Sequence, residues 1–266
     1  GVGHAQHVAG ELDDRALHAE ADAEEGHLVL AGELLGFKDG SGGAFDIIIQ
    51  LGAILAVIVL YWRRFWDVAV GLFSMQQGPL VFTRNVLLGF LPSAVVGAFA
   101  YKAIKAMLES PALVAWALIV GGVAILVIEK FAKENHTASV EQMRWRTALA
   151  IGVVQCLSMI PGVSRSGATI MGALMMGVER KTAAEFSFFL AVPTMMAATA
   201  YALWKDRALL SADDLDMIAI GFTAAFVVAV IVVKAFVALV GRYGFAPFAY
   251  YRIIVGSAAL LWLTMR

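Results

Sequence analysis

The residues best suited to chemistry lie in one stretch of nine residues, 161–169, with the sequence Pro-Gly-Val-Ser-Arg-Ser-Gly-Ala-Thr. Ser164, Ser166 and Thr169 offer hydroxyl groups that can bind an oxyanion. Arg165 adds a planar guanidinium whose fork matches phosphate oxygens. Packing alone does not require three hydroxyls and an arginine so close together. The stretch therefore predicts a cradle for a phosphate or a diphosphate.

Two glycines and a helix start complete the predicted cradle. Gly162 and Gly167 allow positive φ and close approach of the backbone to a ligand. If a helix restarts at Ala168, its free N–H groups point at the loop and favour an anion there. One alternative stays open from the residues alone, namely a helix-breaking loop whose Arg165 snorkels to the membrane interface or pairs with a carboxylate.

The same stretch interrupts a long apolar run. Residues 147–160 precede it and residues 170–178 follow it, and each segment is too short to cross a hydrocarbon core of about 20 helical residues. Backbone that leaves helical geometry at membrane depth is tolerated only where it is buried in protein or lines a polar cavity. We therefore predict a broken, re-entrant pair of half-helices.

The composition of the chain is that of a membrane protein. Of its 266 residues, 61% are hydrophobic and 15% are charged, whereas a soluble domain has about 25% charged residues. The net charge of −1 lacks the basic excess of a nucleic-acid binder, so we expect no nucleic-acid partner. We predict an all-α, polytopic membrane protein with two re-entrant half-helix elements and about six spanning helices, at residues 44–62, 79–101, 112–128, 182–204, 215–240 and 247–265.

The first 25 residues differ from the remainder of the chain. They are polar, and their scattered histidines and acids are weak grounds for a metal site. We interpret residues 1–25 as a disordered or loosely helical leader and residues 26–266 as one integral-membrane domain. Threading the predicted spans makes one side cytoplasmic by the positive-inside rule, because it receives most of the basic residues: Arg63, Arg64, Lys130, Lys133, Arg144, Arg146, Arg180, Lys181 and Arg242.

An internal repeat accompanies this count. Laying Gly26 on Gly167 aligns residues 26–36 with residues 167–177 and the first predicted span with the fourth, without a gap. The two spans run in opposite directions by the threading above. This pattern is typical of an inverted-topology repeat, here about 26–128 and about 147–265, whose broken helices meet near the bilayer midplane.

At this point the residues also resemble a known family, the undecaprenyl-diphosphatases, the bacitracin-resistance type of bacterial membrane phosphatase. The resemblance of the second half is carried by residues 161–169, 185–188 and 191–193, and that of the first half by residues 27–30, 34–37 and 45–57. It covers the chain from about residue 26 to its end, and the arginine-bearing motif is its most specific part.

The resemblance implies hydrolysis of a polyprenyl diphosphate to the monophosphate plus phosphate, which recycles the lipid carrier of cell-wall (peptidoglycan) precursors in the bacterial inner membrane. By that likeness Arg165 binds the diphosphate, Ser164, Ser166 and Thr169 contact its oxygens, and His27 serves as nucleophile or general acid/base. The likeness also implies a divalent cation, Mg²⁺ or Ca²⁺. The expected partners are the lipid and the bilayer, and a homodimer is left open.

Two further polar residues extend the predicted substrate site, which also includes Gly162 and Gly167. Gln155 falls at the repeat position of the family's first glutamate, where it could bind a phosphate or a metal-bound water. Bridging of neighbouring helices is an equal alternative for this residue. Arg252 is predicted as a second phosphate contact.

The first half departs from the family pattern. The family has Glu-x-x-x-Glu and then Pro-Val-Ser-Ser-Thr before Gly-His, whereas residues 19–25 here read Ala-Glu-Ala-Asp-Ala-Glu-Glu. Our hypothesis is a replaced or misread N-terminus. Two alternatives to the phosphatase therefore stay open: a transporter or lipid translocator for an anionic substrate, and a family member without activity.

Overall fold

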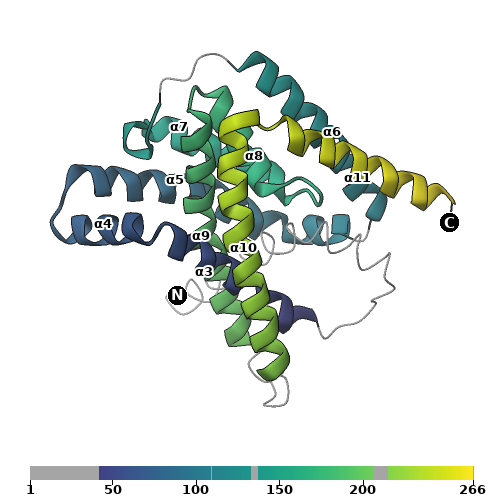
Figure 1. Cartoon of the computed structure of the whole chain (residues 1–266), viewed down its shortest axis with the longest axis horizontal. Helices are drawn as coiled ribbons and strands as arrows, with labels where there is room; N and C mark the ends of the chain where they lie inside the picture. Colours follow the sequence, from purple (N-terminus) through teal and green to yellow (C-terminus); the bar gives the residue numbers. More distant parts are fainter. Residues whose placement is uncertain (1–41, 109, 133–136, 206–214, 266) are drawn as a thin grey trace, which may run out of the picture.

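The structure, a computed structural model, describes residues 42–108, 110–132, 137–205 and 215–265 (Figure 1). The described residues form helices and contain no β-strand, apart from an isolated bridge between Thr137 and Val178. The helices are α3 (Gly42–Leu60), α4 (Trp62–Phe73), α5 (Gln77–Leu108), α6 (Pro111–Phe131), the 3₁₀ turn η1 (Val140–Gln142), α7 (Trp145–Gln155), the 3₁₀ turn η2 (Cys156–Met159), α8 (Arg165–Met175), α9 (Arg180–Lys205), α10 (Leu215–Tyr243) and α11 (Ala246–Met265).

The all-α, polytopic membrane architecture predicted from the sequence is confirmed. Each of the predicted spans falls on a helix, and four of these helices, α5, α6, α10 and α11, are long and apolar enough to cross a membrane. The figure of six spans stays a prediction. So does the inverted repeat, because its first broken element at residues 26–36 lies outside the described residues, as does the whole predicted leader.

Small residues let the long helices pack closely. A Cβ on Gly52 of α3 would lie 2.6 Å from the carbonyl oxygen of Phe222 in α10, and one on Gly256 of α11 would lie 2.7 Å from that of Ala115 in α6. Such contacts are typical of membrane helices, whose association depends on close packing. α10 therefore packs against α3, and α11 lies beside α6 (Figure 1).

The broken pair sits in the middle of this arrangement. α7 packs against α5, where a Cβ on Gly152 would come within 2.3 Å of the carbonyl oxygen of Gly89. α8 packs against α7 and α9, and its Ile170 and Leu174 are buried in one core with Phe186 of α9. The short α8 is therefore held on two sides by protein.

The sequence does not predict the helix α4: the first predicted span ends at Trp62, and Arg63 and Arg64 are assigned only to the cytoplasmic side. In the structure α3 ends at Leu60, and both arginines belong to α4, which lies beside the start of α5 (Figure 1). The helix is amphipathic: Val68 is buried, whereas Trp66 is exposed. A search for span-length apolar runs passes over such a helix.

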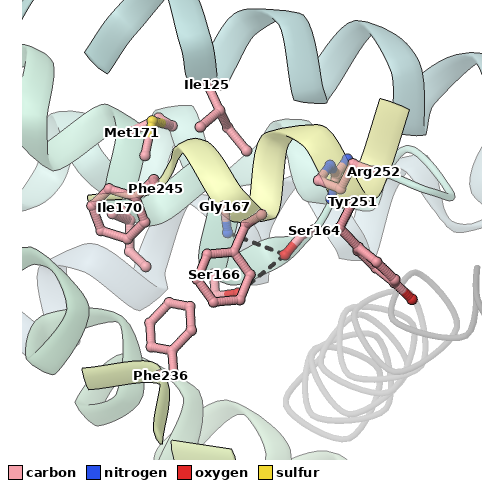
Figure 2. A pocket seen from close by; sticks show the side chains of 11 residues that line it. Ile125, Ser164, Ser166, Gly167, Ile170, Met171, Phe236, Phe245, Tyr251 and Arg252 are labelled. Carbon is pink, nitrogen blue, oxygen red and sulfur yellow. Dashed lines mark hydrogen bonds between the residues drawn. The ribbon is translucent and has the colours of Figure 1, made fainter. Parts of the chain in front are cut away.

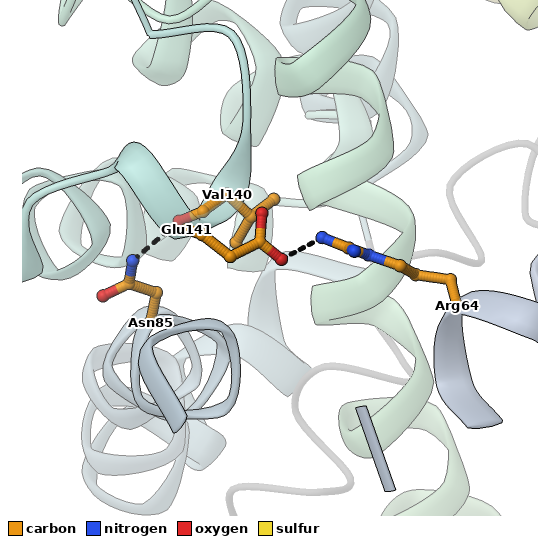
Figure 3. A network of polar contacts seen from close by, with 4 residues as sticks. All are labelled: Arg64, Asn85, Val140 and Glu141. Carbon is orange, nitrogen blue, oxygen red and sulfur yellow. Dashed lines mark hydrogen bonds and ion pairs between the residues drawn. The ribbon is translucent and has the colours of Figure 1, made fainter. Parts of the chain in front are cut away.

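Polar contacts hold the connection between α6 and α7 in place (Figure 3). The buried Asn85 of α5 donates from Nδ2 to the carbonyl oxygens of Val140, at 2.9 Å, and Met143, at 2.8 Å. Arg64 of α4 forms an ion pair with Glu141 of η1. Because η1 lies just before α7, these contacts fix the start of the broken pair.

Glu129, near the end of α6, makes a second set of contacts. Its carboxylate accepts hydrogen bonds from the backbone N–H of Phe245, at 2.9 and 3.0 Å, and lies 3.5 Å from Arg180 Nε. It thereby joins α6 to the start of α9 and to the turn between α10 and α11. Arg64 and Arg180 thus each pair with a carboxylate, at Glu141 and Glu129, and the side of the membrane on which they lie stays a prediction.

Candidate active site

The break between the two half-helices is made at Gly162. Its φ is +88°, a left-handed conformation that glycine adopts readily. A Cβ at this position would also lie 2.5 Å from the carbonyl oxygen of Val114 in α6. A glycine is therefore needed at position 162 both for the positive φ and for the close approach of α6. This agrees with the prediction that Gly162 allows a positive φ and close backbone contact.

The helix after the break starts three residues earlier than predicted. α8 begins at Arg165, not Ala168, because Ser164 acts as its N-cap and accepts a hydrogen bond from the backbone N–H of Gly167 at 3.1 Å. Serine is among the best N-cap residues, so the helix begins as soon as this side chain is available. Gly167 is consequently helical, and it does not use the positive φ that a glycine allows.

Ser164 and Ser166 lie together at the mouth of α8. Their hydroxyl oxygens are 3.0 Å apart, and both side chains line a cavity of about 140 Å³ together with Gly167 (Figure 2). A helix N-terminus favours negative charge, and hydroxyls bind oxyanions. This part of the cavity is therefore suited to a phosphate group.

Arg252 of α11 reaches the same cavity from the other side. It is buried, and its Nη2 donates to the carbonyl oxygen of Gly162 at 2.8 Å and to that of Ala117 at 3.4 Å. Its Nε has no hydrogen-bond partner among the residues that the structure describes. A buried donor of this kind normally finds a partner. Arg252 therefore anchors the loop and places its guanidinium beside the cavity.

Thr169 and Gln155 lie behind α8 instead of lining the described cavity. Both are buried; the Thr169 hydroxyl lies 2.8 Å from the carbonyl oxygen of Arg165 and 3.1 Å from Gln155 Oε1. Gln155 Nε2 in turn donates to Ser93 Oγ of α5 at 3.0 Å. The network joins α5, α7 and α8. Gln155 therefore bridges neighbouring helices, which is the second of the two roles considered for it from the sequence.

Arg165 leaves α8 toward α9. The side chain is half-buried, and its Nη2 lies 3.0 Å from the thioether sulfur of Met195. A thioether is a weak acceptor. The backbone of Arg165 therefore starts the helix beside the two serines, while its guanidinium lies against Met195 of α9.

The predicted nucleophile or acid/base, His27, lies outside the described residues. The described part of the chain contains no group of three or more His, Cys, Asp or Glu side chains that could hold a metal ion, and no carboxylate lines the described cavity. Mg²⁺ and Ca²⁺ prefer oxygen ligands, especially carboxylates. The described residues alone therefore do not form a cage for either cation.

Comparison with known proteins shows the family of this chain. A family model described as "Bacitracin resistance protein BacA" matches residues 24–258. The chain belongs to this family. The matched range contains every predicted site residue, His27 included, and leaves out residues 1–23. The family resemblance that residues 161–169 carry is thus confirmed.

Relatives of this chain in the BacA family carry the name undecaprenyl-diphosphatase. The protein of Sphingopyxis alaskensis is 66% identical over 241 residues, which cover 91% of each chain. That of Rhizorhabdus wittichii is 61% identical over 241 residues, 91% of this chain and 90% of the relative. That of Bordetella avium is 45% identical over 251 residues, 90% and 89% of the two chains.

Sequence reasoning missed several residues that shape this family member's site. Ser93, Asn85 and Glu129 act through contacts with residues distant in the chain, and no short motif contains them. Ser93 follows Pro92 inside an apolar span, and a polar residue in such a place is the one signal that could have indicated a role.

Proposed function

We propose that this chain hydrolyses undecaprenyl diphosphate to undecaprenyl phosphate and inorganic phosphate, and so recycles the lipid carrier of cell-wall precursors. One observation carries the proposal: Ser164, Ser166 and Arg252 converge at the N-terminus of α8 on a cavity whose remaining wall is largely apolar. A substrate with a diphosphate head and a hydrocarbon tail needs such a pair of surfaces. The names of the relatives support the same reaction.

The reaction breaks one phosphoanhydride bond. An oxygen from water forms a new bond to the terminal phosphorus, the bond from that phosphorus to the bridging oxygen breaks, and the bridging oxygen stays with the prenyl monophosphate. We propose that His27 either accepts the proton of the water or is itself phosphorylated and then hydrolysed. Either route gives the same balance of one water consumed.

The negative charge of the transition state gathers on phosphate oxygens, which donors fixed in advance can stabilise. We assign this task to Ser164, Ser166, Arg165 and the guanidinium of Arg252. Gly162 gives the loop its shape and places its carbonyl on Arg252. Thr169 and Gln155, although predicted as direct contacts, are proposed as residues that position α8 behind the site.

We propose a requirement for Mg²⁺ or Ca²⁺, which would neutralise negative charge on the diphosphate. Since the described residues do not supply a set of ligands, no step of the mechanism above passes through the cation. Titration of activity with a chelator and then with each cation tests this part separately. The expected result is loss of phosphate release on chelation and recovery on addition of one of the two cations.

The four membrane-length helices agree with a chain embedded in a bilayer. We propose the inner membrane of a bacterium as its location, with the bilayer and the prenyl diphosphate as its partners and without a nucleic-acid partner. A homodimer stays open and can be decided by the mass of the protein in detergent.

The test of the proposed function is phosphate release from undecaprenyl diphosphate by the purified protein in detergent with Mg²⁺ or Ca²⁺. We expect release by the wild type, and its loss by roughly 100-fold or more in Arg165→Ala and His27→Ala. Arg63→Ala, on the exposed side of α4, serves as the matched control and should behave as wild type. No release by a folded wild type would contradict the proposal, and movement of the lipid between vesicle leaflets would then favour the transporter.

A further inference from the structure

The cavity beside Ser164 and Ser166 has an apolar end that the phosphate chemistry does not use. It is lined by side chains of the helices α6, α8, α10 and α11 and of the turn between α10 and α11: Ile125, Ile170, Met171, Phe236, Phe245 and Phe248. Figure 2 shows Ile170 and Phe245 on one side of Ser166 and Tyr251 and Arg252 on the other. A ligand with its anionic group at Ser166 would therefore extend its first carbon atoms toward the phenylalanines.

The three phenylalanines form one packed surface, here called the aromatic wall (Phe236, Phe245 and Phe248). The ring centroids of Phe236 and Phe248 are 4.8 Å apart, and those of Phe236 and Phe245 are 6.2 Å apart, with tilted planes. Phe188 packs edge-on against Phe236 at 5.9 Å. Tilted and edge-on pairs at such distances are favourable for aromatic rings, so each ring restricts the others.

The backbone of the aromatic wall is also fixed. Both carboxylate oxygens of Glu129 accept hydrogen bonds from the N–H of Phe245, and the N–H of Phe248 donates to the carbonyl oxygen of Phe245 at 3.1 Å. Gly244, just before Phe245, takes a φ of +67°, which allows the tight turn between α10 and α11. The wall is therefore shaped before any ligand arrives.

The volume of the cavity limits what it can hold. A cavity of roughly 150 Å³ lined by aliphatic and aromatic side chains binds benzene, and an isoprene unit has one carbon fewer than benzene. The cavity here measures about 140 Å³. With the phosphate at its mouth beside Ser164 and Ser166, the cavity has room for no more than one isoprene unit, and the remaining units of a long prenyl chain must lie outside it.

We propose that the aromatic wall recognises the isoprene unit that is joined directly to the diphosphate, and so selects allylic prenyl diphosphates over saturated alkyl diphosphates. This inference rests on the proposed phosphatase function, and adds to it the part of the lipid that the site reads. An isoprene unit is flat around its double bond and carries a methyl branch, so it fills a space between rings and loses little freedom on binding. A saturated unit is neither flat nor rigid.

The experiment compares farnesyl diphosphate with the analogue in which only the first isoprene unit is saturated. Since hydrolysis occurs at the phosphoanhydride bond, saturation leaves the reacting atoms unchanged and alters only the group at the wall. For the wild type we expect a ratio of kcat/KM of about tenfold in favour of farnesyl diphosphate, at the lower end of what a hydrophobic pocket achieves between closely similar ligands.

Variants assign that ratio to the aromatic wall. In Phe236→Leu and Phe248→Leu it should fall toward one, while the ratio between farnesyl and geranyl diphosphate stays as in wild type, because only the first unit enters the cavity. Phe65→Leu is the matched control: Phe65 is half-buried like Phe236 and packs on Phe189 at 5.4 Å, but it does not line the cavity. It should keep the wild-type preference.

Equal kcat/KM values for the two substrates in wild type, or a preference that survives in both wall variants, would overturn the inference while leaving the phosphatase intact. Absence of phosphate release from either compound would instead overturn the proposed function. In that case the same ratio is measured from the Kd values of the two compounds by calorimetry, and equal Kd values would count against the wall as well.

Discussion

The helix α8 carries a hydroxyl side chain on the face toward the cavity and another on the opposite face, and the two hydroxyls have different roles. Ser166 and Ile170, one helical turn apart, face the cavity, whereas Arg165 and Thr169, also one turn apart, contact α9 and α7. Both faces present hydroxyls within the same motif. The hydroxyl of Ser166 meets its neighbour Ser164 in the cavity, while that of Thr169 is hydrogen-bonded within the protein. A motif therefore identifies a site without saying which of its residues contact the ligand.

This difference has a physical origin. A buried hydroxyl must find a hydrogen-bond partner, and the nearest acceptors of Thr169 are the carbonyl of Arg165 and the side chain of Gln155. Ser166 lies where the apolar cavity begins and keeps its oxygen accessible to a ligand. Thr169, at the back of α8, thus helps to determine where the helix lies, whereas the cavity side of the helix binds the substrate, together with Arg165 as proposed above.

The largest expected effect belongs to the cavity side, at Arg252. Arg252→Lys retains a positive charge but loses the planar fork, so one group can no longer hold the carbonyl of Gly162 and present a donor to the phosphate. We expect kcat/KM for phosphate release to fall roughly 100-fold to 1,000-fold, as for loss of a donor at a transition-state oxyanion. Activity of Arg252→Lys near that of wild type would show that only the positive charge of Arg252 matters, and that its planar fork does not.

Much of the arrangement could be predicted from the sequence, because the length of an apolar run fixes whether a helix can span a bilayer. The spans, the break and the need for Gly162 follow from this and from the conformational freedom of glycine. The start of α8 was missed because capping by Ser164 was not weighed against a start at Ala168. The contact between Arg252 and Gly162 joins residues 90 apart, and no local pattern reports it.

The direction of each hydroxyl was equally out of reach. Thr169 could be placed on a helix from the sequence, but its partner Gln155 belongs to a different half-helix, and the packing of α7 against α8 decides the contact. The helix α4 shows the same limit for a whole element. Its amphipathic pattern becomes meaningful only beside α5 and Glu141, which it contacts.

A pair of substitutions of intermediate effect compares the two faces directly. Ser166→Ala should lower kcat/KM roughly 10-fold to 100-fold, the worth of one hydrogen bond to a charged group, with little change in Tm. Thr169→Val should instead remove about 1 kcal/mol of stability and lower Tm by roughly 2–4 °C, with most of the activity retained below the transition. Thermal unfolding in detergent beside phosphate release measures both. A large loss of activity in Thr169→Val at unchanged Tm would place Thr169 on the substrate and end the division between the faces.

The smallest expected effect lies farthest from the cavity, at Ser93. Its Oγ accepts the hydrogen bond of Gln155 Nε2 and donates to the carbonyl oxygen of Phe90 at 2.9 Å, so it is the third member of the network behind α8. Ser93→Ala should lower the free energy of unfolding by about 1 kcal/mol and leave KM unchanged, because the substitution removes a contact of α5 with α7 and none in the cavity.

Combining Ser93→Ala with Thr169→Val sharpens the test, since residues in one hydrogen-bond network do not contribute independently to stability. If the network is a unit, the double variant loses less stability than the two single losses added together. Strict additivity would mean that Gln155 contacts Ser93 and Thr169 as separate pairs, and that α8 is positioned by its apolar packing against α9 instead.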